Sequence, residues 1–251
     1  MNTTDALLGS LQTDAPVRQV FLGAFWTAVV LDTDPVRCGL ASTTHAGHGD
    51  HHRSGSPMPE AGRLLQYSGR QLAEGLRSER PLEASVGMAA LNALLDVDEG
   101  ACIELNAEDI IVERGQGRRV AIVGHFPFVE RIRQAADECW VVEMNPRPGD
   151  VPAERSAEVL SQADMVALTG TSLINHTFDK VIAACRPETF VLLLGPSAPL
   201  TPVLFEARVG AISGTRVIHT EKVLPLVEQG ATFRQIKRSG GVRLLTMVRE
   251  A

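Results

Sequence analysis

The feature that most constrains the fold is a regular alternation of short apolar segments and helical segments in the second half of the chain. Strands are expected at residues 119–124, 140–144, 164–169 and 189–194, with a fifth element at 210–213 and 216–218. Helices are expected at residues 129–139, 156–162, 173–185, 202–207 and 221–228. Short apolar strands that alternate with helices are typical of a parallel sheet covered on both faces. Right-handed crossovers then predict a Rossmann-like, doubly wound α/β domain.

The first half has a different pattern, which predicts a small α+β domain. Residues 17–31 are expected to form one long strand, with residues 36–41 pairing back on it after a turn. Ser68 and Gln71 have the spacing of a capping box, and Pro81 suits the first turn of a helix that is apolar all round and therefore buried. We expect domains at residues 1–110 and 111–251, and a terminal hairpin made by residues 233–238 and 242–249.

Composition excludes several classes of function. The net charge is −6 and there are only 8 Phe, 2 Trp and 1 Tyr, which argues against nucleic acid or an anionic membrane as the main partner. No apolar run approaches the ~20 residues of a membrane span. The four cysteines lie far apart and form no CxxC pair, so we expect buried, inert thiols and a cytoplasmic protein. Homo-oligomerisation is compatible with this class, but no residue specifies it.

The ends of the expected strands contain the candidate ligand-binding residues, because ligands of open parallel sheets bind beyond the carboxyl ends of the strands. Four of the five ends combine glycine with a small hydroxyl residue, a histidine or an amide. Glycine lets the backbone approach a ligand closely, and hydroxyl groups suit phosphate or carboxylate. The candidates are Gly124, His125, Phe126, Glu143, Asn145, Gly170, Thr171, Ser172, Asn175, Gly195, Pro196 and Ser197.

Glu143 occupies a position typical of a ribose-binding acid, 19 residues after Gly124. The first turn nevertheless lacks G-x-G-x-x-G, and His125-Phe126-Pro127 adds bulk where a pyrophosphate would need close backbone approach. The sequence therefore has no NAD or FAD fingerprint. Two alternatives for Glu143 stay open. It could bind a nucleoside-bearing ligand that lacks a pyrophosphate, such as S-adenosylmethionine, or it could be an exposed carboxylate at a strand end without a role.

Histidines are the candidate metal ligands, although the metal they would hold is not specified by the sequence. His125 and His176 stand at expected strand ends and could act as acid, base or ligand. Imidazole and carboxylate groups suit a divalent transition metal such as Zn, Ni, Cu or Fe. A polar loop contains Asp50 and four more histidines, but its spacing matches no standard closed zinc site: His45, His48, His51 and His52. Neither a nucleophile elbow nor a P-loop is present in the sequence.

Four segments carry a resemblance to known proteins: PLEASVGMAALNALL (81–95), VGHFPF (123–128), TGTSLINHTFDKVI (169–182) and LLGPSAPL (193–200). Together they resemble the family of “putative heavy-metal chelation” proteins, and the hairpin FWTAVVL with RCGLAS resembles the small domain that accompanies that family. The resemblance covers nearly the whole chain. It implies an N-terminal domain similar to that of enolase, a Rossmann-like C-terminal domain and a site in the cleft between them. The family's motif turns match Gly124, Gly170, Thr171, Ser172, Asn175, Gly195, Pro196 and Ser197, whereas the histidine loop is not part of its pattern.

Three functional hypotheses follow. The first is a small-molecule-binding protein that takes a heavy metal or metal chelate in the cleft, with His125, Glu143 and His176 as ligands or proton carriers. The second is an enzyme that acts on a heterocyclic or nucleoside-like substrate at the same cleft, for example by methyl transfer. The third is a regulatory or assembly module whose cleft has no ligand.

Overall fold

The computed structural model describes residues 2–45 and 56–249, which form two compact units. The first unit consists of Met1–Val97, Leu173–Asn175 and Thr215–Arg243, and the second of Asp98–Ser172, His176–Gly214 and Leu244–Ala251. The expected domain boundary after residue 110 stays a prediction, because compact units of packing need not coincide with units that fold independently.

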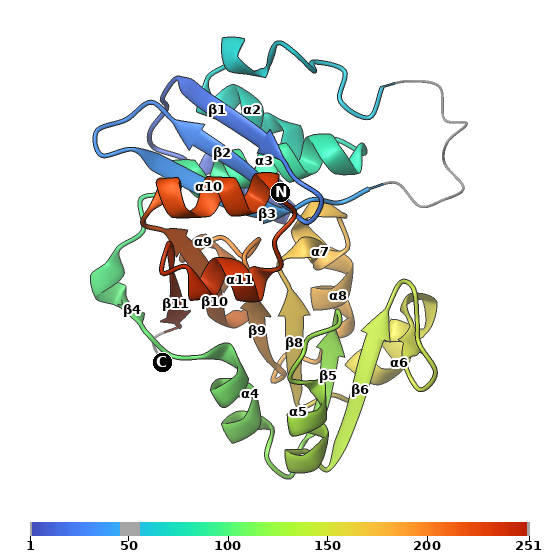
Figure 1. Cartoon of the computed structure of the whole chain (residues 1–251). Coiled ribbons are helices and arrows are strands. Elements are labelled where there is room, and N and C mark those ends of the chain that lie inside the picture. The colour runs from blue at the N-terminus through green and yellow to red at the C-terminus, as the bar shows by residue number, and fades with distance from the viewer. Residues whose placement is uncertain (1, 46–55, 250–251) are drawn as a thin grey trace. The chain divides into compact units, whose positions relative to one another are not determined.

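The first unit contains a three-stranded antiparallel sheet of β1 (Val17–Leu22), β2 (Trp26–Leu31) and β3 (Arg37–Ser42), in that order (Figure 1). The predicted pairing of residues 36–41 with the preceding strand is confirmed. The prediction of a single long strand at residues 17–31 is wrong. The Gly23 amide donates to the Trp26 carbonyl at 2.9 Å, so the chain reverses there and forms two strands. A Cβ atom on Gly23 would stand 2.2 Å from the Val227 carbonyl oxygen, which explains why glycine occupies this turn.

Helices cover both faces of this small sheet. On one face lies α3 (Pro81–Leu94), so close to the sheet that a Cβ atom on Gly39 would stand 2.1 Å from the Ala89 carbonyl oxygen. On the other face, α10 (Thr220–Glu228) and α11 (Phe233–Arg238) contribute Val223, Val227 and Ile236 to a core with Ala28 and Val30. Burial on both faces explains why β2 is buried along almost its whole length instead of alternating.

The first unit also contains α1 (Thr3–Gly9) and α2 (Gly69–Ala73). The Ser68–Gln71 capping box and the initial Pro81 are confirmed. The prediction of a terminal hairpin is wrong. Residues 233–238 form the helix α11, and of the two expected strands only the second is a strand, β11 (Val242–Val248). A second capping box, between Thr232 and Gln235, begins α11 and explains the difference.

The larger sheet has the strand order β4-β11-β10-β9-β8-β5-β6-β7. Pairing is parallel from β10 to β7 and antiparallel between β4 and β11, and the arrowheads of β5, β6, β8 and β9 point the same way in Figure 1. The strand bounds are β4 (Cys102–Ile103), β5 (Arg119–Val123), β6 (Glu138–Glu143), β7 (Val151–Pro152), β8 (Met165–Thr169), β9 (Phe190–Leu194) and β10 (Val209–Val217).

Helices pack on both faces of the parallel strands, as expected for a doubly wound sheet. Ile111 of α4 and Ile132 of α5 lie in one core with Val120, Ile122 and Met165 of the strands. The alternate strand residues, such as Ala121 and Val166, are also fully buried. The helix bounds are α4 (Ala107–Gly115), α5 (Val129–Ala135), α6 (Ser156–Leu160), α7 (Thr171–Ile174), α8 (Phe178–Ala184) and α9 (Val203–Glu206). The predicted α/β fold class is confirmed.

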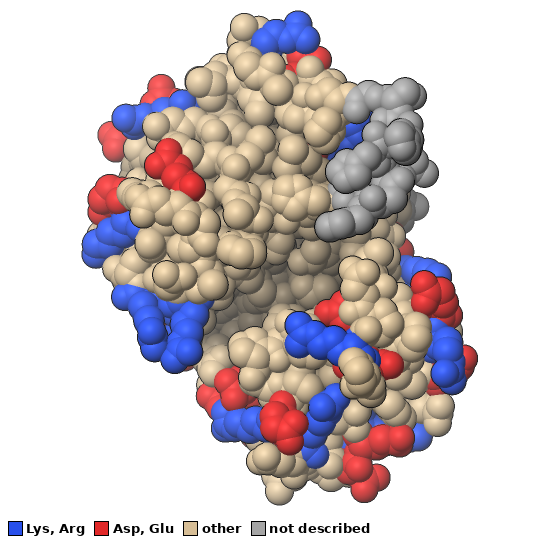
Figure 2. Space-filling view, turned by 45° about the vertical axis from the view of Figure 1, so that its right-hand side comes forward, with Lys and Arg blue, Asp and Glu red and all other residues tan. Residues whose placement is uncertain are grey.

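Two surface properties of the described residues bear on possible partners. None of their helices is long and apolar enough to cross a membrane. Figure 2 shows acidic and basic side chains mixed with one another, mostly toward the edges and in the lower part of the face that it presents, with a broad area between them that carries neither.

Candidate functional site

The strand order creates a topological switch point next to β5. From β5 the chain moves outward to β6 on one side, and then crosses to β8 and β9 on the other side. The connection that follows β5 and the connection that follows β8 therefore run in opposite directions across the sheet. Open α/β sheets bind ligands at such a point, beyond the carboxyl ends of the two strands. We call the ends of β5, β6, β8 and β9, with the turns that follow them, the carboxyl end of the sheet.

The turn after β5 places Gly124, His125 and Phe126 at this switch point. Gly124 has a φ of 105°, a conformation that side chains disfavour, and its amide donates to the Val142 carbonyl at 3.0 Å. A Cβ atom on Gly124 would stand 3.1 Å from Cβ of Thr169, so the ends of β5 and β8 approach closely. Phe126 stacks on Phe128 with ring centroids 5.1 Å apart, which gives the turn an aromatic wall.

The turn after β8 contains the hydroxyl residues predicted for the site. The Ser172 hydroxyl donates to the Thr169 carbonyl at 2.7 Å, so its proton is already used within the turn. A Cβ atom on Gly170 would stand 2.5 Å from the Ala198 amide nitrogen, which shows how tightly the turn after β9 lies against this one. Ser172 and Ser197 are both buried. Gly195, which begins the turn after β9, has a φ of 109°.

The helix expected at residues 173–185 is broken, and the break contains two candidate residues. α7 ends at Ile174 and α8 begins at Phe178. Between them His176 has a φ of 59°, a left-handed conformation that is uncommon for residues other than glycine and that ends α7. His176 belongs to the second unit, whereas Asn175 belongs to the first.

The end of β6 supplies an acidic residue and an exposed loop. Glu143 is half-buried, and its carboxylate accepts a hydrogen bond from the Met144 amide at 3.2 Å. Asn145 is exposed. Because β6 pairs with β5 in register up to Val123 and Val142, Glu143 stands directly beside the turn that begins at Gly124.

Two residues of this loop were missed by the sequence analysis and join His125 in a polar cluster. Arg147 Nη1 lies 2.9 Å from Nε2 of His125, and Asp150 Oδ2 lies 3.9 Å from its Nδ1. The Asp150 side chain is only 3% exposed. The signal that could have identified them is the sequence Arg147-Pro148-Gly149-Asp150, which is typical of a tight turn, directly after an expected strand.

Metal ligands are not gathered in the part of the chain that the structure describes. Among those residues no group of three or more His, Cys, Asp or Glu side chains could hold a metal ion. Of the histidine loop, His45 is described and exposed, and Asp50, His48, His51 and His52 lie outside the described residues. All four cysteines are free thiols, and burial raises the pKa of Cys38 to about 12 and of Cys185 to about 11, which keeps both thiols protonated.

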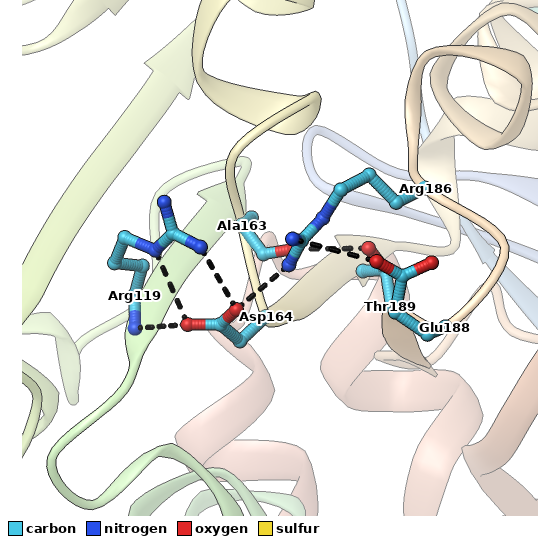
Figure 3. A network of polar contacts seen from close by, with 6 residues as sticks. All are labelled: Arg119, Ala163, Asp164, Arg186, Glu188 and Thr189. Atoms are coloured by element: carbon cyan, nitrogen blue, oxygen red, sulfur yellow. Dashed lines mark hydrogen bonds and ion pairs between the residues drawn. The ribbon is translucent and has the colours of Figure 1, made fainter.

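A second polar cluster lies at the opposite, amino end of the same strands (Figure 3). Asp164 accepts hydrogen bonds from the Arg119 amide at 3.0 Å, from Arg119 Nη2 at 3.1 Å and from Arg186 Nη2 at 2.7 Å. These donors, the Arg119 side chain first among them, hold the pKa of the Asp164 carboxyl well below its usual range. Arg186 Nη1 also lies 3.4 Å from Glu188. The cluster joins the starts of β5, β8 and β9, and its charges neutralise one another.

Two family models match the chain, and together they cover most of it. Both have the description “Putative heavy-metal chelation”: the DUF364 model matches residues 106–246 and the DUF4213 model matches residues 4–95. An uncharacterised protein of Methanocaldococcus jannaschii is 27% identical over 152 residues, a region that spans 57% of this chain and 58% of the relative.

Two crystal structures of DUF364 proteins of unknown function share the fold over nearly the whole chain. The protein from Desulfitobacterium hafniense is 24% identical, with a TM-score of 0.83 and coverage of 98% of this chain and 97% of the other. The protein from Pyrococcus horikoshii is 18% identical, with a TM-score of 0.80 and coverage of 98% of both chains. At these identities the similarity establishes the fold alone.

Proposed function

The chain belongs to the family described as “Putative heavy-metal chelation”, and we propose that it binds a metal ion or metal chelate at the carboxyl end of its parallel sheet. The observation that most supports this site is the switch point between β5 and β8, where Gly124 stands against Thr169. Placement of the ligand in a cleft between two domains stays a prediction.

The residues at the carboxyl end of the sheet would contribute to ligand binding in different ways. Glycines would let the backbone approach the ligand, and Glu143 and His176 would act as metal ligands or proton carriers. His125 would do the same on exchanging the Arg147 guanidinium at its Nε2 for the ligand. The hydroxyl and amide groups would give hydrogen bonds, although the proton of Ser172 is already donated within its turn. The proposed set is Gly124, His125, Phe126, Glu143, Asn145, Gly170, Thr171, Ser172, Asn175, His176, Gly195, Pro196 and Ser197.

The described residues fit a metal that arrives with ligands of its own better than a bare ion. A closed site needs about four protein ligands, and no cluster of even three is present among the described residues. The protonated thiols of Cys38 and Cys185 are also poor ligands. A bound metal would supply a positive charge at the switch point, and the protein would hold and orient it through a few side chains.

Metal analysis of the purified, untagged protein tests the proposal, together with calorimetric titration of Ni, Co, Zn, Cu and Fe ions and their citrate complexes. We expect stoichiometric binding of at least one form. The His125→Gln variant should bind about tenfold more weakly, a loss of about 1.4 kcal/mol. His219→Gln is the matched control, because His219 is an exposed imidazole in the first unit. Absence of stoichiometric binding by every metal form would overturn the proposal.

A second candidate function, an enzyme for a nucleoside-like substrate, is favoured by the position of Glu143. This carboxylate ends the strand beside β5, where dinucleotide-binding folds place the acid that binds ribose hydroxyls. Thermal-shift measurements with adenosine-bearing and pterin-like compounds test it, since saturation at 100 times Kd stabilises a protein by about 2.7 kcal/mol. Glu143→Gln should abolish the shift, and Glu138→Gln, at the other end of the same strand, should leave it intact. A full shift in Glu143→Gln would exclude ribose binding by this residue.

A further inference from the structure

Arg147 is held at the carboxyl end of the sheet by a tight turn with reciprocal hydrogen bonds. The Asp150 amide donates to the Arg147 carbonyl at 2.9 Å, and the Arg147 amide donates to Asp150 Oδ2 at 2.9 Å. Pro148 and Gly149, whose φ is 94°, occupy the central positions as a type II turn requires. The backbone of Arg147 is therefore fixed between β6 and β7.

The guanidinium group of Arg147 is directed at an imidazole and not at a carboxylate. Arginine only donates hydrogen bonds, so Nε2 of His125, 2.9 Å away, must be the acceptor. The imidazole proton is then on Nδ1, the atom that faces the buried Asp150 carboxylate 3.9 Å away. An imidazole carries no negative charge, so His125 positions Arg147 without neutralising its guanidinium group.

Other arginines of the second unit show what a neutralised guanidinium looks like. Arg119 and Arg186 share Asp164, Arg131 pairs with two acidic side chains, and Arg155 pairs with Glu158 at 2.7 Å. Arg147 forms no ion pair with any side chain of residues 2–45 and 56–249. Its charge and most of its N–H groups thus remain available for an anion, for which the planar guanidinium is well suited.

We propose that the carboxyl end of the sheet recognises its metal as an anionic complex with a polycarboxylate chelator, and that Arg147 binds a carboxylate of that chelator. The inference rests on the proposed function and names its ligand class. The guanidinium of Arg147 repels a bare cation but attracts a complex with net negative charge. The absence of a three-ligand cluster among the described residues agrees with a metal whose coordination is already filled largely by the chelator.

Isothermal titration of the full-length protein with Ni²⁺ alone, citrate alone, inorganic phosphate and the anionic Ni²⁺–citrate complex tests this inference. We expect wild type to bind the complex at least about tenfold more tightly than Ni²⁺ alone. Arg147→Gln should lose about tenfold or more in affinity for the complex, because the charged donor is removed. Arg147→Lys should recover part of the lost affinity, because lysine restores the positive charge but not the planar guanidinium group that can donate two hydrogen bonds to one carboxylate. Arg155→Gln, an exposed arginine of the same unit, is the matched control and should bind as wild type.

The outcomes separate this inference from the proposed function. If Ni²⁺ alone binds as tightly as the complex, or if Arg147→Gln binds the complex as wild type does, the anionic-chelate inference is overturned while metal binding stands. If citrate or phosphate alone binds as tightly as the complex, the site takes an anion without metal and this inference is overturned, and the binding of the other metal forms then decides the proposed function. Binding of none of the four probes would overturn this inference, and the wider metal series would then decide the proposed function.

Discussion

The amino and carboxyl ends of the same parallel strands are held together by different means. At the amino end, Asp164 joins two arginines in a network of charged side chains. At the carboxyl end, glycines let one turn lie directly against the next, as at Gly170 and Ala198. The charges of the amino end are paired within the protein, whereas at the carboxyl end Arg147 has no acidic side-chain partner among residues 2–45 and 56–249 and its guanidinium contacts the His125 ring.

This difference indicates how one sheet can separate stability from binding. Charged groups that neutralise one another hold the starts of the strands together and leave no net charge to attract a ligand. Turns built from close backbone contact need few side chains for their own packing, which leaves polar groups such as Arg147 for another molecule. The following substitutions test that division.

The largest effect is expected for Gly170→Ala, which would break the close contact at the carboxyl end. The new Cβ atom would stand 2.5 Å from the Ala198 nitrogen and 2.7 Å from the Ser197 carbonyl carbon, both backbone atoms that cannot rotate away. We expect a loss of about 3 kcal/mol in the free energy of unfolding, measured by urea denaturation. Gly9→Ala, where no atom lies within 4 Å of the new Cβ, should be close to neutral. A near-neutral Gly170→Ala would mean that backbone contact does not hold this end together.

The next largest effect is expected for Asp164→Asn at the amino end. The variant keeps the shape of the side chain but loses the charge that two guanidinium groups contact. Because the side chain is 29% exposed, we expect a loss of only about 1–2 kcal/mol. Added salt should reduce this loss and should not change that of Gly170→Ala. Equal salt sensitivity in the two variants would remove the distinction between the ends.

The pH dependence of the free energy of unfolding gives a second test of the role of Asp164. The folded-state pKa of Asp164 is lowered from 3.8, so the carboxylate stabilises the fold fully above that unfolded-state value. The stabilisation is lost progressively as the pH falls from about 4 toward the lower folded-state pKa. The difference in urea midpoint between wild type and Asp164→Asn should therefore be constant from pH 7 to about 5 and should narrow below about pH 4. A difference that widens on acidification would contradict the role of Asp164.

A smaller loss of stability is expected for Gly124→Ala and Gly195→Ala, and the difference between the two variants is informative. Both positions have strongly positive φ angles, 105° and 109°, so both variants should lose about 1–2 kcal/mol through backbone strain. Only Gly124→Ala adds a contact, 3.1 Å from Cβ of Thr169, and its unfolding midpoint in urea should be the lower of the two. Equal midpoints would show that strain, and not the approach of β5 to β8, sets the cost.

The smallest effect on stability is expected for Arg147→Gln. Its guanidinium is exposed and, within the part of the chain that the structure describes, bonds only to His125, so thermal denaturation of the ligand-free variant should match wild type. The stabilisation of wild type by the Ni²⁺–citrate complex should be reduced in the variant. A large fall in the melting temperature without ligand would instead make Arg147 a structural residue like Arg119.

The repeating pattern of the second half made its fold predictable, because short buried strands and helices differ in length and periodicity. Errors arose where a single backbone feature overrides a local pattern. Gly23 turns an apolar run that otherwise resembles one strand, and His176 breaks a continuous helical pattern. Thr232 and Gln235 begin a helix in a segment that resembles a hairpin strand.

The candidate site was less predictable than the fold, for a physical reason. The ends of strands can be read from apolar runs, so the turns at Gly124, Gly170 and Gly195 were identified. Arg147 was not, because a charged residue in a loop is usually solvated, and only the packing of its turn shows that it is directed at His125. Contacts between turns depend on strand order, which the sequence does not state.

The packing of residues 215–243 with the N-terminal sheet has a consequence for biosynthesis. The face of that sheet that contains Ala28 and Val30 is covered by Val223, Val227 and Ile236, which are translated about two hundred residues later. A nascent chain emerging from the ribosome thus displays an uncovered apolar surface until translation reaches α11. Molecular chaperones have their greatest opportunity to engage the polypeptide during that interval.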